Sequence, residues 1–161
     1  MKFGRGVLWA ITAFAIQFAI PPALAQFAFE KHDRVALIGN ALPDRMQHDG
    51  WLEAYLQAAN PDKKLVMRTL AFSGDEVVRR PREEGYPRPD ELLTLVRANV
   101  IFAFFGYNES YCHDPEMFKN DLRNFIDETA KKKYDGKAAP RIVLFSPIAH
   151  ENLNSPNLPS G

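Results

Sequence analysis

Short apolar runs recur along the chain, and most of them stop at a residue that ends a strand. The runs cover residues 34–39, 65–70, 100–105 and 142–146. The first closes with Gly39, the third stops before Gly106 and the fourth before Pro147. Unbroken apolar runs of this length are typical of strands buried on both faces of a parallel sheet. The pattern therefore predicts four interior strands.

Helical spacing fills the intervals between these runs. The apolar positions from Trp51 to Ala59 share one helical face, and Asn60-Pro61-Asp62 ends that helix. A shorter helix is predicted from Asp90 to Arg97, after Pro89. A third helix begins after Asp114-Pro115 and finishes in residues 131–133, all lysines, where positive charge suits the negative end of the helix dipole.

Each predicted helix carries a set of apolar residues that should face the sheet. These are Trp51, Leu52, Tyr55, Leu56 and Ala59 in the first helix, Leu92, Leu93 and Val96 in the second, and Phe118, Leu122, Phe125 and Ile126 in the third. Strands that alternate with helices in this way predict an α/β fold, a three-layer doubly wound parallel sheet.

The stretch 73–89 has no helical or strand periodicity. It interleaves arginines and glutamates with Pro81, Gly85, Pro87 and Pro89. We expect a long loop after the second strand. Because ligands bind at the carboxyl ends of the strands in such folds, this loop should overhang the site. A solvated charged loop without a function is the alternative.

The first 25 residues differ from the rest. Lys2 and Arg5 precede an uncharged apolar run, Val7 to Ile20, which two prolines and Ala23-Leu24-Ala25 close. This is the pattern of a secretory signal peptide, with cleavage before Gln26. A membrane anchor is the alternative, but the apolar run is shorter than the roughly 20 residues that span a bilayer. The sequence therefore predicts export, to the periplasm or the extracellular space, with no membrane span after cleavage.

Residues 26–161 have the length of one domain. The end, Leu153 to Gly161, is rich in asparagine, serine and proline and supplies neither a fifth strand nor a closing helix. A four-stranded parallel sheet with an uncovered edge is unusual as a complete domain. We therefore expect a fold that is incomplete at its C-terminal side, poorly stable alone and prone to associate through the open edge.

Charge and cysteine content narrow the function. The 20 basic and 20 acidic residues balance, which argues against a nucleic-acid partner. The single cysteine, Cys112, cannot form a disulfide framework. It is adjacent to His113 and Asp114 and close to Glu109, but consecutive residues rarely converge on one ion. Neither a metal nor another cofactor is expected.

Three strand ends carry the residues that could do chemistry. They read Ile38-Gly39-Asn40-Ala41, Phe72-Ser73-Gly74-Asp75-Glu76 and Phe105-Gly106-Tyr107-Asn108-Glu109. In order and spacing, over residues 33–150, these blocks resemble the SGNH (GDSL-type) esterases. That family has Gly-Asp-Ser after its first strand, a glycine after its second, Gly-x-Asn after its third, and Asp-x-x-His near its C-terminus. The resemblance implies a flavodoxin-like topology.

The resemblance also implies two oxyanion donors, the backbone N–H of Gly74 and the side-chain amide of Asn108. Acyl transfer needs such donors beside a nucleophile. Taken singly, Gly74 could be a turn glycine and Asn108 an Asx-turn residue. Their joint placement at the matching strand ends favours the family reading.

The nucleophile block departs from the family pattern. Ala41 stands where the family has serine, and Asn40 replaces aspartate. The nearby hydroxyls, Ser73, Ser110 and Ser146, do not lie at the end of the first strand. None of the mature chain's histidines, His32, His48, His113 and His150, has an aspartate three residues before it. His150 follows the fourth strand and is expected either to face the same pocket or to lie in a surface loop.

The resulting hypothesis is an exported SGNH-type hydrolase-like domain, related to esterases of carbohydrate or lipid esters, with weak or no activity as this chain. Its partner would be a small-molecule or carbohydrate ester. A module that holds a polar ligand such as a glycan without cleaving it is one alternative. A truncated product without independent function is the other.

Overall fold

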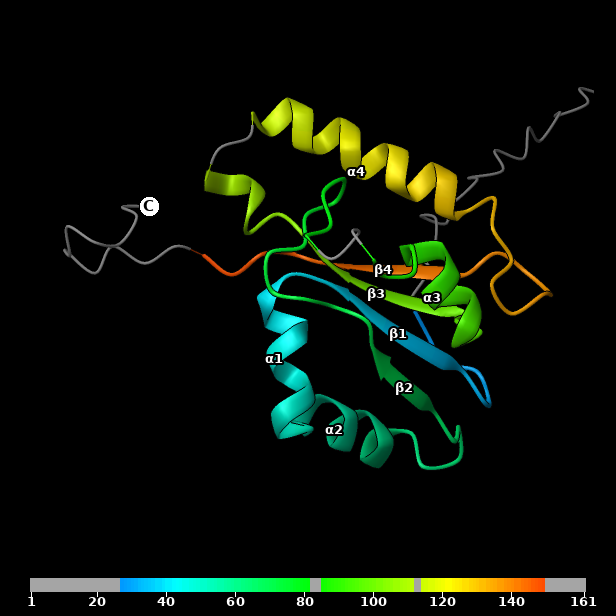
Figure 1. Cartoon of the computed structure of the whole chain (residues 1–161). Helices are drawn as coiled ribbons and strands as arrows, with labels where there is room; N and C mark the ends of the chain where they lie inside the picture. The colour runs from blue at the N-terminus through cyan, green and yellow to red at the C-terminus, as the bar shows by residue number, and fades with distance from the viewer. Residues whose placement is uncertain (1–26, 82–84, 112–113, 150–161) are drawn as a thin grey trace, which may run out of the picture.

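Four parallel strands form one sheet in the order β2-β1-β3-β4 (Figure 1). The computed structural model describes residues 27–81, 85–111 and 114–149. The strands are β1 Arg34–Gly39, β2 Val66–Thr69, β3 Val100–Phe104 and β4 Arg141–Phe145. All four predicted strands are confirmed, with ends that shift by at most one residue.

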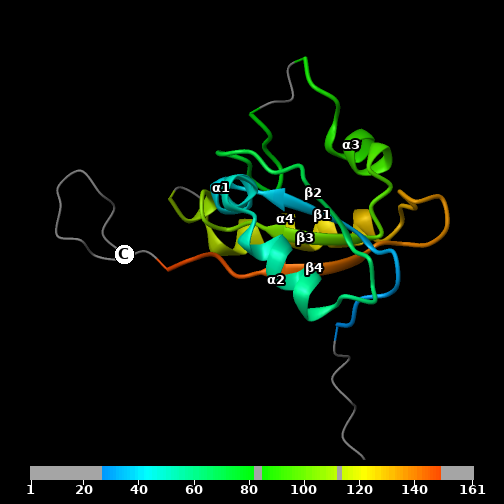
Figure 2. The same ribbon diagram turned by 90° about the horizontal axis from the view of Figure 1, so that it is seen from below.

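The helices form a layer on each side of the sheet (Figures 1 and 2). They are α1 Ala41–Asp49, α2 Trp51–Ala59, α3 Pro89–Leu95 and α4 Pro115–Thr129, with a short 3-10 turn at Glu109–Tyr111. The chain passes from β1 to β2 on one side and then returns across β1 to β3, which reverses the direction of winding. The predicted doubly wound α/β fold is confirmed.

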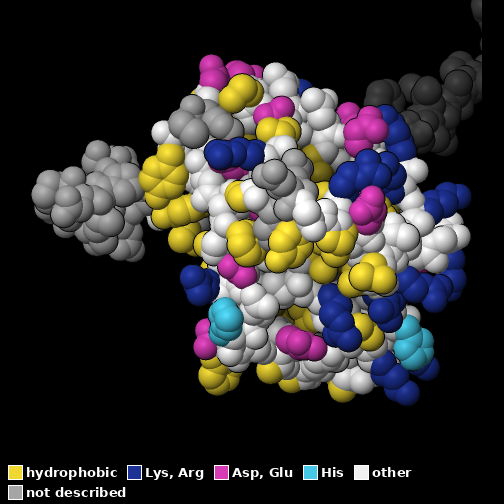
Figure 3. Space-filling model, viewed as in Figure 1, with side chains coloured by type: hydrophobic (Ala, Val, Ile, Leu, Met, Phe, Trp, Pro, Cys, Tyr) yellow, Lys and Arg dark blue, Asp and Glu magenta, His cyan; other side chains and the backbone are white. Residues whose placement is uncertain are grey.

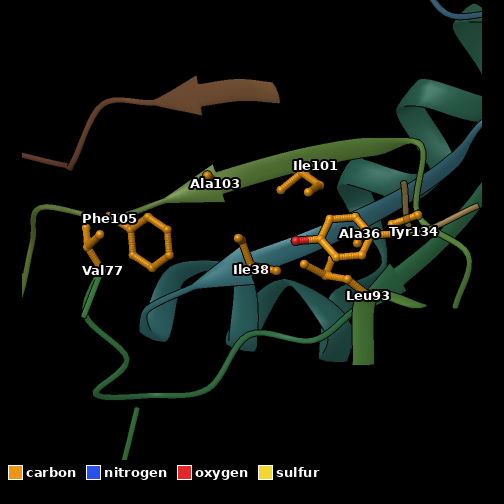
Figure 4. Packing of buried hydrophobic residues seen from close by; sticks show 9 residues of the cluster. Ala36, Ile38, Val77, Leu93, Ile101, Ala103, Phe105 and Tyr134 are labelled. Atoms are coloured by element: carbon orange, nitrogen blue, oxygen red, sulfur yellow. The ribbon is translucent and has the colours of Figure 1, made fainter. Parts of the chain in front are cut away.

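Two apolar clusters hold the layers together. On one face Val35, Leu37, Met67 and Phe102 pack with α1 and α2. On the other, Ala36, Ile38, Ile101, Ala103 and Phe105 alternate with them along the same strands and pack with α3 and α4 (Figure 4). This alternation explains the unbroken apolar runs in the sequence, because both faces of β1 and β3 are covered.

Helix α1 was not predicted, although residues at both its ends favour it. Asn40 is its N-cap, with a side-chain oxygen that accepts a hydrogen bond from the Leu42 N–H at 3.1 Å. Gly50 ends it in the left-handed conformation, with φ at 65°. Its apolar residues Leu42 and Met46 contact the sheet, but Pro43 and the many polar positions hide the helical period.

The predicted inner face of α2 is partly wrong. Leu52 and Leu56 pack against the sheet, as expected. Trp51 and Tyr55 are 79% and 72% exposed, and Ala59 is exposed as well. Residues 52 and 56 are one turn apart and form the stripe that faces the strands, while 51 and 55 lie about 100° round the helix from it.

The predicted start of α4 is confirmed and its end is not. Asp114 caps the helix, since its carboxylate accepts a hydrogen bond from the Glu116 N–H at 2.7 Å. The helix stops at Thr129, so the lysines follow it instead of occupying its last turn. One of them, Lys132, reaches α3 and pairs with Asp90 at 3.0 Å.

The signal peptide and the C-terminal stretch lie outside the described residues, so the expectations about them stay predictions. Within the described residues, β4 forms one edge of the sheet. No helix in that part of the chain has the length and apolarity that crossing a bilayer requires.

Candidate functional site

The carboxyl ends of β1, β2 and β3 meet at one edge of the sheet, and hydrogen bonds fix their relative positions. The Asn40 N–H donates to the Phe104 carbonyl at 3.1 Å, which ties the end of β1 to β3. The Phe72 N–H donates to the Gly39 carbonyl at 3.1 Å, which ties it to the chain after β2. The three predicted sequence blocks are therefore neighbours in space.

Gly39 allows this close approach. Its φ is +119°, and a Cβ at this position would lie 2.1 Å from the Phe104 carbonyl oxygen. No side chain fits there, so the contact between β1 and β3 at the site requires glycine.

The block at the end of β1, residues 38–41, has a structural role. Asn40 is buried, and its side chain serves as the N-cap of α1. Ala41 is the first residue of that helix and is half-buried. Its N–H has no intrahelical acceptor, as is general for a first helical residue. The Ala41 methyl group cannot attack a carbonyl, so this position supplies a backbone donor only.

After β2, the chain turns at Ser73 and Gly74. The Ser73 N–H and hydroxyl both donate to the same carboxylate oxygen of Asp44, at 3.1 Å and 2.7 Å. The hydrogen bond from the Ser73 hydroxyl is the main cause that lowers the pKa of Asp44. Asp44 was not singled out from the sequence, because it lies in the helix that the pattern did not predict. It anchors the Gly74 turn to α1.

Gly74 is exposed and has a φ of +94°. Its N–H donates to no acceptor within the described ranges. The Asn108 side chain lies next to this turn, since its amide nitrogen donates to the Asp75 carbonyl at 3.1 Å. An amide has two N–H groups, and this contact uses one. The structure thus places Gly74 and Asn108 together at the strand ends. We call Ala41, Gly74 and Asn108 the donor cluster.

Glu109 holds the loops behind the donor cluster. It is 3% exposed, and its two carboxylate oxygens accept from the Val77 N–H at 2.8 Å and the Gly106 N–H at 2.9 Å. Both oxygens are thus used in bracing the backbone. No group of metal-ligating side chains occurs among the described residues, and Cys112 and His113 fall outside them.

Part of the loop 73–89 is internal, so it is not simply a solvated charged segment. Asp75 is buried, and its carboxylate lies 3.9 Å from the Arg80 guanidinium. The same guanidinium stacks over the Phe105 ring at 4.6 Å. Arg79 and Arg88, by contrast, are exposed on the rim.

Comparison with known proteins adds one finding about the fold. No family model and no curated protein matches the sequence. A solved structure of the psychrotrophic esterase EstA from Pseudoalteromonas sp., inhibited by monoethylphosphonate, superposes with a TM-score of 0.51 at 14% identity. The match covers 71% of this chain and 61% of the esterase. The fold is similar to that of an SGNH-type esterase. The resemblance is confirmed at the level of the fold.

The remaining hydroxyls and histidines do not complete an SGNH-type catalytic site within the described residues. The Ser110 hydroxyl donates to the Tyr107 carbonyl at 2.6 Å, and Ser146 is exposed after the edge strand β4. His48 is exposed near the end of α1, and His32 precedes β1 at the opposite end of the sheet. His150 lies outside the described residues, so its predicted place near the pocket stays a prediction.

Proposed function

We propose that this chain is an exported SGNH-type hydrolase-like domain that binds an ester or a related oxyanion at the donor cluster, with negligible turnover as this chain. The observation that carries the proposal is the juxtaposition of Gly74 and Asn108 at the carboxyl ends of the strands. The likeness to an esterase fold supports the hydrolase-like assignment.

The donor cluster suits an oxygen that carries negative charge. Backbone and amide N–H groups directed at such an oxygen stabilise it most where the groups are already in place before the ligand binds. Gly74 and Asn108 are held by the Asp44 and Asp75 contacts, and the N–H of Ala41 belongs to the start of α1, which favours anions. The site therefore binds a polarised carbonyl or a phosphonate better than a cation.

Turnover needs more than these donors. Ser73 is the hydroxyl nearest to Gly74 in the chain, and Asp44 is the base that this hydroxyl contacts. A carboxylate with a lowered pKa is a weak base, so it activates the hydroxyl poorly. Ala41→Ser alone should therefore restore little activity, because a serine there would still lack a base.

Binding is tested by NMR titration of the whole chain with ethylphosphonate. We expect the Gly74 N–H and the Asn108 side-chain amide to shift, and Asn108→Ala to weaken binding about tenfold, the loss of one hydrogen bond to a charged acceptor. Ser110→Ala is the matched control, since it removes a nearby exposed hydroxyl that donates its hydrogen bond to the Tyr107 carbonyl. Unshifted Gly74 and Asn108 signals would sink the proposal.

Turnover is tested with nitrophenyl acetate on the wild type, Ala41→Ser and Asn108→Ala. We expect all three to be close to the uncatalysed rate. Rapid hydrolysis by the wild type that Asn108→Ala abolishes would reveal another nucleophile, and Ser73 with His150 would be the first pair to examine.

Export is tested separately. Mass spectrometry of secreted protein should find a mature N-terminus at Gln26, and a retained Met1 would contradict the signal peptide.

A further inference from the structure

A cavity bordered by described residues reaches Asp75, the neighbour of Gly74 in the chain, and Ala41 is not part of its lining. Its volume is about 760 Å³, and it occupies the α3 and α4 side of the sheet, under the loop that follows β2. This volume is in the range of about 300 to 1,000 Å³ that is usual for small-molecule sites. Its apolar wall is formed by Ile38, Leu70, Val77, Leu92, Leu93 and Phe125. Figure 3 shows hydrophobic side chains across the middle of the face that is seen in Figure 1, between α4 and the α1–α2 layer. We call this cavity the α3–α4 groove.

Two residues that line the groove are close to the donor cluster in the chain. Asp75 lines the groove with its side chain, follows Gly74 in the chain, and accepts the Asn108 amide with its carbonyl. Ile38, another lining residue, precedes the Gly39-Asn40 turn. A ligand with its oxygen at Gly74 and Asn108 would reach the groove past Asp75.

Several charged groups at the groove have partners in neighbouring side chains. Asp90 binds Lys132 at 3.0 Å and accepts the Tyr134 hydroxyl at 2.6 Å. Arg80 lies against the Asp75 carboxylate and the Phe105 ring. A sugar would need many polar groups that are directed at its hydroxyls, whereas Asp90, Lys132 and Tyr134 are engaged with one another and Arg80 lies at ion-pair distance from Asp75. What the groove offers to a ligand is apolar surface.

We infer that the α3–α4 groove binds the acyl chain of an ester whose carbonyl oxygen lies at the donor cluster. This inference rests on the proposed function and selects a lipid-type ester over a carbohydrate ester. The driving force is the removal of methylene groups from water against Leu92, Phe125 and Val78.

A series of alkylphosphonates of rising chain length tests the inference on the full chain. Each methylene buried in the groove should tighten binding roughly threefold, so octylphosphonate should bind far more tightly than ethylphosphonate. Val78→Asn removes apolar surface from the groove at a residue that is 60% exposed, so it should fold normally. Leu92→Asn does the same on α3.

Both groove variants should weaken octylphosphonate at least about threefold and leave ethylphosphonate unchanged. Leu95→Asn is the matched control. Leu95 is 76% exposed, lies on the same helix and does not line the groove, so its substitution should change neither affinity.

The outcomes separate this inference from the proposed function. Affinity that does not rise with chain length, while ethylphosphonate still binds through Asn108, would overturn the groove and leave the proposed function standing. Octylphosphonate binding that Val78→Asn weakens and Asn108→Ala does not would show that the chain binds in the groove without the donor cluster, and it would overturn both the inference and the proposed function. Equal weakening by Val78→Asn and Leu95→Asn would overturn the inference.

Discussion

At the amino ends of the strands, Asp33 is fully buried and makes its hydrogen bonds to protein groups. At the carboxyl ends, Gly74 is exposed, and its N–H donates to no acceptor within the described residues. Asp33 accepts from the Glu30 N–H at 2.7 Å, from the Asn99 side chain at 3.1 Å and from Arg141. Arg141 also donates to the Ala28 carbonyl at 2.7 Å. This Asp33 network joins the segment before β1 to β4.

The difference separates two uses of polar residues. Buried groups that satisfy one another hold strands in place but leave nothing for a ligand. Donors that are fixed by their neighbours and are not used within the protein stay available to water or to a ligand. The donor cluster has the second character, and the Asp33 network has the first.

The largest expected effect comes from Gly39→Ala, which disrupts the contact between β1 and β3 at the carboxyl ends of the strands and replaces no residue of the donor cluster. The new Cβ would overlap the Phe104 carbonyl, and alanine is strained at φ +119°. Backbone strain and overpacking together should cost about 4 kcal/mol of unfolding free energy, measured by urea denaturation. Gly136→Ala is the control, since φ is +80° there but nothing lies within 4 Å of the new Cβ. Equal losses in both variants would show that the overlap is relieved elsewhere.

The next effect is at the amino ends. Asp33→Asn leaves Arg141 beside a neutral side chain and should cost about 3 kcal/mol, as for a broken buried pair. The α3–α4 groove and the donor cluster lie at a distance, so the affinity of the folded protein for ethylphosphonate should stay unchanged. Asp62→Asn removes the exposed partner of Lys63 and should cost less than about 1 kcal/mol. Urea titration measures both. A loss of phosphonate affinity in Asp33→Asn would show that the two ends are coupled.

The strands could be predicted because β1 and β3 are covered on both faces, so burial alone makes their apolar runs continuous. The inward face of α2 could not be resolved, because the aromatic residues at positions 51 and 55 count as apolar together with the leucines beside them but lie off the contact stripe. Helix α1 has few apolar positions, and its caps, Asn40 and Gly50, also suit a turn.

For the site, strand ends were the informative signal. Parallel strands place their carboxyl ends at one edge, and the resemblance to the SGNH esterases singled out Gly74 and Asn108 at two of these ends. The contacts that hold these two residues in place could not be predicted from the sequence. Asp44 reaches Ser73 across 29 positions of sequence, and Glu109 reaches Val77 across 32. Nothing in the local sequence marks these partners, because they depend on how loops fold back over the sheet.

Asn99 at the amino ends of the strands and Asn108 at the carboxyl ends form a matched pair that tests the difference between the two ends. Asn99 accepts from the Arg34 N–H at 2.8 Å and donates to Asp33, while Asn108 makes one bond to the Asp75 carbonyl. Asn99→Ala should cost about 2 kcal/mol of stability and leave ethylphosphonate binding intact. Asn108→Ala should cost less than about 1 kcal/mol and weaken binding. Calorimetric melting and NMR titration of both variants test this crossover, which two variants with the same pattern of loss would refute.

The smallest effect concerns the Asp44 anchor. The Ser73 hydroxyl lowers the pKa of Asp44 below its unfolded value, so the ionised carboxylate stabilises the folded state at neutral pH. That contribution is complete above the unfolded pKa of about 4 and is lost as the pH falls through the lower folded value.

Ser73→Ala should return the Asp44 pKa toward its ordinary range and make the Gly74 N–H exchange faster with solvent, because the turn loses one of its two bonds to α1. Carboxyl NMR titration and amide exchange measure the two effects. Glu128 is the internal control, since the hydrogen bond from Lys131 lowers its pKa independently of Ser73. If the Asp44 pKa stayed low in Ser73→Ala while Glu128 was also unchanged, the donor cluster would owe its position to Asn108 and Asp75 alone.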